Sequence, residues 1–208
     1  MMARLVLASA SPARLQTLRS AGLFPEVVVS GVDETTVTAD SVPGLTGRLA
    51  RLKAEAAAVR LGHDQQTTIV VGCDSLLELD GTVYGKPGSA ADATDRWRRM
   101  RGRSGVLHTG HHVLVRRTGQ QQSASAVAST TVHFADLTDA EIAAYVATGE
   151  PLEVAGAFTI DGLGGAFVTG IEGDHHNVVG ISLPLLRTLL RGLGIAWPSL
   201  WTGISTRA

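Results

Sequence analysis

Ser9, Ser11 and Arg14 stand where a phosphate group could be held. They follow the apolar run Leu5–Ala8 and flank Pro12, a pattern typical of a strand, a tight loop and the first turn of a helix. Backbone N–H groups at a helix N-terminus attract anions, and Arg14 adds a full positive charge. The segment is predicted to bind phosphate, and the alternative is that a serine only caps the helix.

Carboxylates follow two predicted strands. Asp74 comes after the apolar run Thr67–Gly72 and is expected at the carboxyl end of a core strand, where open α/β sheets hold their chemistry. A carboxylate that interrupts an apolar run costs stability unless it is paired or binds a metal ion. Asp33 and Glu34 follow the predicted strand Glu26–Ser30, where they form either a solvated turn or oxygen ligands for a hard metal ion.

Two lysines could neutralise phosphate charge. Lys53 lies at the edge of the apolar stripe of a predicted helix, Pro43–Leu61, where a lysine either extends to solvent or points into a cleft. Lys86 is fixed between Gly85 and Pro87, a setting that a simple turn would explain equally well. Cations in these places would offset charge on a leaving phosphate group.

The elements that position these residues alternate between helical and extended patterns, which predicts an α/β protein. The 208 residues contain no repeat or linker, so they are expected to form a single domain, 1–208. The other predicted helices are Pro12–Ala21, Ser89–Arg101, Thr138–Gly149 and Ser182–Gly192. The other predicted strands are Leu76–Leu79 with Thr82–Tyr84, Val106–Arg117 with Ala124–Phe134, and Ala157–Asp161 with Ala166–Ile171.

Composition excludes several classes of protein. Lys and Arg (18) nearly balance Asp and Glu (19), so no general field attracts nucleic acid or an anionic membrane. Aromatic residues make up 4% of the chain, a low share that disfavours a base-stacking nucleic-acid surface. Neither a signal peptide nor an apolar run of transmembrane length is found, and a cytoplasmic location is expected. Cys73 lies in an apolar pattern and is predicted to be a core residue.

Two groups of basic side chains have a structural and a functional interpretation. Arginines in and after the helix Ser89–Arg101 indicate a solvated helix face, with contact to a triphosphate or a partner as the alternative. Histidines in the strand Val106–Arg117 lack a carboxylate or cysteine at ligand spacing, which disfavours a metal triad. The residues are Arg96, Arg98, Arg99, Arg101 and Arg103, and His108, His111 and His112.

Seven segments, in order, make the chain resemble the Maf family of nucleoside triphosphate pyrophosphatases, from Leu5 to about Leu190. The resemblance implies a mixed twisted α/β sheet in two lobes with a nucleotide cleft between them, similar to inosine triphosphate pyrophosphatases. It also implies hydrolysis between the α- and β-phosphates, with Mg²⁺ or Mn²⁺, to a nucleoside monophosphate and pyrophosphate. The segments are LASASPAR (7–14), VDE (32–34), Lys53, GCDS (72–75), GKP (85–87), GEPLEVAGAF (149–158) and GDHHNVVGISLP (173–184).

The resemblance also implies a role for each candidate residue. Asp74 aligns with the family's proton acceptor, which would deprotonate water or hold the metal ion. Glu34, with Asp33 as a weaker candidate, would ligate the metal ion or orient the water. The residues that would bind or neutralise phosphate are Ser9, Ser11, Arg14, Lys53 and Lys86.

Three positions bear on base specificity. Ala13, Ser75 and Asp161 stand where the subfamily that prefers thymidine and uridine triphosphates has an arginine, a threonine and a glutamine. Ala13 also differs from the tryptophan of the subfamily that prefers 7-methylguanosine. These differences remove donors and add an acceptor, so the sequence does not predict the base.

Two other functions remain open at this stage. The family has been connected with septum formation, so the alternative is a nucleotide-binding regulator with little turnover. Nucleic-acid binding would require the arginine run as its basic face. A homodimer is a further expectation, because the leucine face of the final helix could pack against a second subunit.

Overall fold

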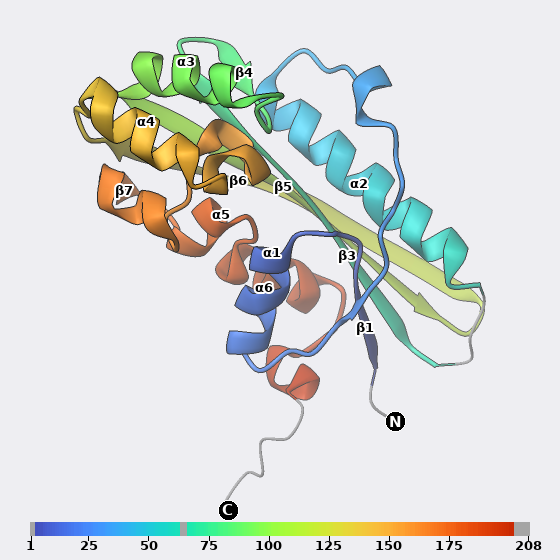
Figure 1. Cartoon of the computed structure of the whole chain (residues 1–208). Helices are drawn as coiled ribbons and strands as arrows, with labels where there is room; N and C mark the ends of the chain where they lie inside the picture. The colour runs from blue at the N-terminus through green and yellow to red at the C-terminus, as the bar shows by residue number, and fades with distance from the viewer. Residues whose placement is uncertain (1–2, 63–65, 202–208) are drawn as a thin grey trace, which may run out of the picture.

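A single mixed sheet organises the chain in the computed structural model, which describes residues 3–62 and 66–201 (Figure 1). The strand order is β2-β1-β3-β5-β6-β7, and β4 lies beside β3. β1 runs parallel to β2 and β3, and the other pairs are antiparallel, which confirms the predicted mixed α/β sheet. The strands are β1 (Arg4–Leu7), β2 (Glu26–Val27), β3 (Thr68–Leu79), β4 (Thr82–Tyr84), β5 (Ser104–Arg117), β6 (Gln120–Phe134) and β7 (Val168–Glu172).

Side-chain caps fix where the long helices begin. The hydroxyls of Ser11, Ser41, Ser89, Thr138 and Ser182 each accept a hydrogen bond from a backbone N–H of the first turn. The helices are α1 (Pro12–Ser20), α2 (Val42–Arg60), α3 (Ala90–Met100), α4 (Asp139–Ala147), α5 (His175–Val179) and α6 (Leu183–Gly192). Short 3₁₀ turns are η1 (Glu34–Thr36), η2 (Glu150–Glu153), η3 (Ala155–Ala157), η4 (Leu163–Phe167) and η5 (Trp197–Leu200).

The three long strands β3, β5 and β6 join two large cores. α1 and α6 pack at one end of these strands, and α3 and α4 pack at the other (Figure 1). α2 covers the opposite face of the sheet and builds a smaller, alanine-rich core. Three leucines of the predicted α6 face, Leu186, Leu189 and Leu190, are buried within the first core, and the fourth, Leu183, is partly buried and packs against it.

α2 lies directly on the sheet because two strand positions are glycine. A Cβ at Gly72 would come within 2.2 Å of the Ala50 carbonyl oxygen, and a Cβ at Gly110 within 2.2 Å of the Thr46 carbonyl oxygen. Glycine inside a strand is typical of such a close backbone approach. The contact brings Lys53, on the next turn of α2, over β3.

β3 is longer than predicted. The prediction that Asp74 follows the end of a core strand is wrong, because β3 continues through Asp74 to Leu79. Residues 73–75 pair with residues 109–111 of β5, and such long-range pairing leaves no local sequence signal. Asp74 therefore lies inside a strand that connects both cores.

Three other predicted strands are also corrected. Ala157–Asp161 is not a strand: Gly156 and Ala157 adopt positive φ, and the Glu150 carboxylate draws the following glycine-rich segment into turns. The strand predicted at Ala166–Ile171 forms at Val168–Glu172. β2 covers only Glu26–Val27 of the predicted Glu26–Ser30, since its partner β1 ends at Leu7.

The helices of residues 3–62 and 66–201 were compared with the length and apolar character that a membrane span requires. None is both long and apolar enough to cross a bilayer.

Candidate active site

One edge of β3 has a single partner strand, and the other edge has two partners with unpaired residues between them. β5 pairs along one edge from Thr68 to Glu78, while on the other edge β1 pairs with residues 68–71 and β4 with residues 77–79. Within the part of the chain that the structure describes, no strand pairs with residues 72–76 on that second edge. Asp74 lies at the centre of these residues without a strand partner on that edge, which we call the open stretch of β3.

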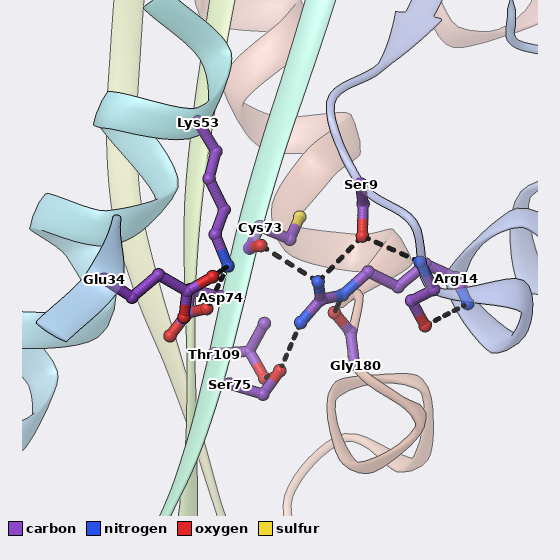
Figure 2. A network of polar contacts seen from close by, with 10 residues as sticks. Ser9, Arg14, Glu34, Lys53, Cys73, Asp74, Ser75, Thr109 and Gly180 are labelled. Carbon is purple, nitrogen blue, oxygen red and sulfur yellow. Dashed lines mark hydrogen bonds and ion pairs between the residues drawn. The ribbon is translucent and has the colours of Figure 1, made fainter. Parts of the chain in front are cut away.

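Glu34, Lys53 and Asp74 form an acid–lysine cluster beside the open stretch (Figure 2). Lys53 Nζ lies 2.6 Å from Asp74 Oδ1 and 2.7 Å from Glu34 Oε1. The Asp74 and Lys53 side chains are 8% and 12% exposed, whereas Glu34 is 50% exposed. One ammonium group thus bridges a buried carboxylate on the strand and a solvent-facing carboxylate on η1.

Burial makes Asp74 a better base than an ordinary aspartate. Desolvation raises the pKa of Asp74, while the charges of Lys53 and Arg14 oppose the rise and Glu34 adds to it. A carboxylate whose pKa is raised takes up a proton more readily near neutral pH. The geometry therefore suits proton abstraction from water at this carboxylate.

Asp33 has a local role next to this cluster. Its carboxylate accepts hydrogen bonds from the Thr35 backbone N–H and hydroxyl, which caps η1. The cap fixes the turn that carries Glu34. Of the two neighbouring carboxylates, Glu34 is the one that contacts Lys53.

Arg14 forms an arginine hub on the other side of β3, with Ser9, Cys73, Ser75 and Gly180 (Figure 2). Its Nε donates to the Gly180 carbonyl at 2.7 Å, and its Nη1 donates to Ser9 Oγ and the Cys73 carbonyl, both at 3.0 Å. Its Nη2 donates to Ser75 Oγ at 2.9 Å. Four of the five N–H donors of this buried guanidinium are thus used by the chain itself.

Ser9 and Ser11 lie together at the N-terminus of α1, as the sequence predicts. Ser9 Oγ accepts from the Ser11 backbone N–H at 3.2 Å, and Ser11 Oγ accepts from the Arg14 backbone N–H at 3.4 Å. The capping interpretation of Ser11 is correct, and both hydroxyls keep lone pairs or a proton for a further contact.

Lys86 is the sequence-predicted site residue that the structure leaves apart. It lies on the loop after β4, 66% exposed, with Nζ 3.9 Å from Glu153 Oε2. In the described ranges no contact joins Lys86 to Lys53 or Asp74. Its side chain is therefore free to reorient toward a bound anion.

Two of the three specificity positions line one groove. Ala13 on α1 and Asp161 face a groove of about 280 Å³ between α1 and α5. Ser75 instead belongs to the arginine hub, where its hydroxyl also contacts Thr109 Oγ1 at 2.9 Å. The other polar lining residues were not singled out from the sequence, although the His-His pair was a visible signal: Gln16, Thr17, Ser20, His175 and His176.

The remaining candidates have structural partners. His111 is buried and accepts the Ser182 N–H at Nε2, and burial lowers its pKa to about 4. Cys73 is buried in the core as predicted, and burial raises its pKa to about 12, which makes it a poor nucleophile. The arginine run makes contacts within the chain: Arg96 with Asp92, Arg98 and Arg101 with Asp139, and Arg103 with Asp80.

The fold and the site define an α/β protein that combines a buried carboxylate, nearby cations and a helix N-terminus beside one strand, a set of groups suited to a phosphate-containing substrate. The chain belongs to the Maf-like protein family, whose model matches residues 4–193.

Two curated relatives of this chain share one name. A protein of Salinispora tropica named nucleoside triphosphate pyrophosphatase is 62% identical over 98% of this chain and 90% of its own length. A protein of Cutibacterium acnes with the same name is 55% identical over 95% of this chain and 94% of its own length. Among solved structures, the Staphylococcus aureus Ham1 protein is 15% identical, covers 91% of this chain and 99% of its own, and has a TM-score of 0.46.

Proposed function

We propose that this protein is a nucleoside triphosphate pyrophosphatase that cleaves the bond between the α- and β-phosphates. The enzyme class is the one named for its relatives. The observation that carries the chemistry is the buried Asp74 carboxylate, bridged to Glu34 by Lys53 beside the open edge of β3. We include in the proposal a cytoplasmic location and a role in clearing non-standard nucleotides.

The reaction divides among the chain's own residues. Asp74 accepts a proton from the attacking water, and the water oxygen bonds to the α-phosphorus. The α-phosphorus–oxygen bond to the β-phosphate breaks, and its electron pair leaves with pyrophosphate. Lys53 and Lys86 offset the negative charge that builds on the departing group. Asp74 then returns its proton to solvent, so the cycle closes.

We propose that the carboxylates of the acid–lysine cluster would hold a divalent cation together with substrate phosphates, since the described residues contain no group of three or more His, Cys, Asp or Glu side chains that could hold one alone. Asp74 Oδ2 and Glu34 Oε2 make no hydrogen bond or ion pair within the described residues, so each carboxylate keeps an oxygen for a ligand. Mg²⁺ and Mn²⁺ favour oxygen ligands, and Mg²⁺ is often held by one or two carboxylates together with substrate phosphates. When bound, such a cation lowers the pKa of water and polarises phosphoryl oxygens.

Phosphate and base would bind on the α1 side of the site. Ser9 and Ser11, at the helix N-terminus, have hydroxyl capacity for phosphate oxygens, and Arg14 keeps one Nη2 proton. The groove that Ala13 and Asp161 line is our candidate for the base. Ser75, the third specificity position, would act through its contact with Arg14.

The test is product analysis with purified protein, Mg²⁺ or Mn²⁺, and a panel of standard and modified nucleoside triphosphates. We expect release of pyrophosphate rather than orthophosphate, and loss of about 10²- to 10⁴-fold in turnover for Asp74→Asn. Asp40→Asn, an exposed carboxylate far along the loop, is the matched control. Folded protein that binds triphosphates without turnover would instead support the regulatory alternative connected with septum formation.

A further inference from the structure

The loop that carries Lys86 is held by an ion pair on α3. Arg96 Nη1 donates to the Gly85 carbonyl at 2.6 Å, and its Nη2 lies 3.4 Å from the Lys86 carbonyl. Asp92 Oδ2 accepts the Gly88 N–H at 3.0 Å. The pair therefore forms hydrogen bonds with the loop backbone at Gly85, Lys86 and Gly88.

Arg96 and Asp92 are joined by two side-chain hydrogen bonds. Arg96 Nε lies 3.0 Å from Asp92 Oδ1, and Arg96 Nη2 lies 2.7 Å from Asp92 Oδ2, a two-pronged contact one helical turn apart. The guanidinium carbon lies 5.4 Å from the centre of the Tyr84 ring, and the Arg96 side chain is only 12% exposed. A lysine at this position would lack the planar fork needed for all these contacts.

The loop backbone and the lysine side chain contrast sharply. Gly85 is also held from the other side, because its carbonyl accepts the Gly156 N–H at 3.1 Å. The Lys86 side chain is 66% exposed and has a weak ion pair with Glu153. A backbone held by hydrogen bonds with an exposed ammonium group is what a residue needs when it must meet a bound phosphate at a defined place.

The neighbouring arginines make no hydrogen bond to the backbone of this loop within the described residues: Arg99, also on α3, interacts with the Tyr84 side chain. Arg98 pairs with Asp95 and Asp139, and Arg101 pairs with Asp139 and the Leu137 carbonyl. These contacts connect α3 to the start of α4. Only the Asp92–Arg96 pair, among the described contacts of α3 arginines, reaches the backbone of Gly85–Gly88.

We infer that Asp92 and Arg96 are positioning residues for Lys86, and that they set how well its ammonium group meets the leaving pyrophosphate. The inference rests on the proposed function, in which Lys86 offsets charge on the leaving group. It assigns the arginine run a part in catalysis through one member only, and that member acts through the loop backbone rather than by touching substrate.

A double-mutant cycle tests the inference. Arg96→Gln, Asp92→Asn and the control Arg98→Gln are each made alone and in a Lys86→Ala background, and kcat and KM for pyrophosphate release are measured. We expect Arg96→Gln to lower kcat about 10-fold or more in the wild-type background, since small displacements of a catalytic group are costly. In the Lys86→Ala background it should change kcat less than about twofold, because coupled residues are not additive. Arg98→Gln should have no effect in either background.

A binding measurement keeps the test independent of turnover. Titration calorimetry with inorganic pyrophosphate should show weaker binding for Lys86→Ala and for Arg96→Gln, with no further loss in the double variant. Hydrogen exchange at the Gly88 amide should accelerate in Asp92→Asn and Arg96→Gln but not in Arg98→Gln.

The outcomes separate the two proposals. Equal losses from Arg96→Gln with and without Lys86 would overturn the positioning role and leave a general structural one. Wild-type protein that releases no pyrophosphate from any triphosphate would refute the proposed function. If, in that case, pyrophosphate binding is also unaffected by Lys86→Ala and Arg96→Gln, the inference is overturned as well.

Discussion

The two polar clusters on either side of β3 differ in how completely their charges are satisfied. In the acid–lysine cluster, Lys53 is shared by two carboxylates, and one of these, Glu34, is half exposed. In the arginine hub, a buried guanidinium donates to four protein oxygens. Both clusters lie at the open stretch of the same strand, but the two carboxylates belong to the first, and the hub keeps a single N–H donor of Arg14.

The difference assigns the clusters distinct tasks. Groups that make most of their hydrogen bonds inside the protein mainly hold structure together, because breaking them leaves buried partners unsatisfied. Groups that keep unused hydrogen-bond donors or acceptors near solvent can act on a ligand. We therefore assign the chemistry mainly to the acid–lysine cluster. The main role of Arg14 is to connect α1, β3 and the turn before α6.

Gly110→Ala should disturb the acid–lysine cluster and have the largest effect on stability and turnover together. The new Cβ would come within 2.2 Å of the Thr46 carbonyl oxygen, so α2 must move away from the sheet and carry Lys53 with it. We expect a loss of about 3 kcal/mol in unfolding free energy and of about 10²-fold in turnover. Gly192→Ala, where an added Cβ meets nothing within 4 Å, is the control and should leave urea unfolding and activity intact.

His111 offers a pH test of the hub side. Its Nε2 accepts the Ser182 N–H at 2.8 Å, so the ring must be neutral, and burial lowers its pKa from 6.5 to about 4. The unfolded chain binds more protons in that window, so the stabilisation is full above about pH 6.5 and is lost as the pH falls toward 4. Urea unfolding at pH 7 and pH 4.5 should show a loss approaching about 3 kcal/mol that His111→Gln lacks. An equal loss in both proteins would contradict the buried neutral ring.

Asp161 should affect base choice more than chemistry. It lines the groove with Ala13, and its carboxylate can accept a hydrogen bond from an exocyclic amino group of a base. We expect Asp161→Asn to change the ratio of kcat/KM values between cytidine and uridine triphosphates about tenfold, while kcat on the better substrate stays within about threefold. An unchanged ratio would remove the groove as the base site.

Local signals predicted much of this molecule. Ser11, Ser89 and Thr138 cap helices where the sequence suggested helix starts, and Cys73 is buried as its apolar setting indicated. Lys53 contacts Glu34 and Asp74 although the three residues come from distant segments of the chain. The sequence predicted them as candidate site residues but did not predict these contacts.

Long-range contacts account for what the sequence did not predict. Asp74 is part of a continuous strand only because β5 pairs alongside it, and the strand at Ala157–Asp161 is lost because Glu150 binds the following N–H groups. Gly72 and Gly110 carried a readable signal for a close helix, but not for which helix. The contact between Arg96 and the Lys86 loop depends on how α3 packs, which no local pattern encodes.

The most direct test measures unfolding free energy and kcat/KM together for Asp74→Asn and Arg14→Met. Burial disfavours the Asp74 charge, so we predict unchanged or increased stability for Asp74→Asn with at least about 10²-fold lower kcat/KM. Arg14→Met strips donors from four buried or half-buried oxygens and should cost about 3 kcal/mol or more. If Arg14→Met keeps wild-type stability and loses activity as severely as Asp74→Asn, the division between the two sides of β3 is wrong.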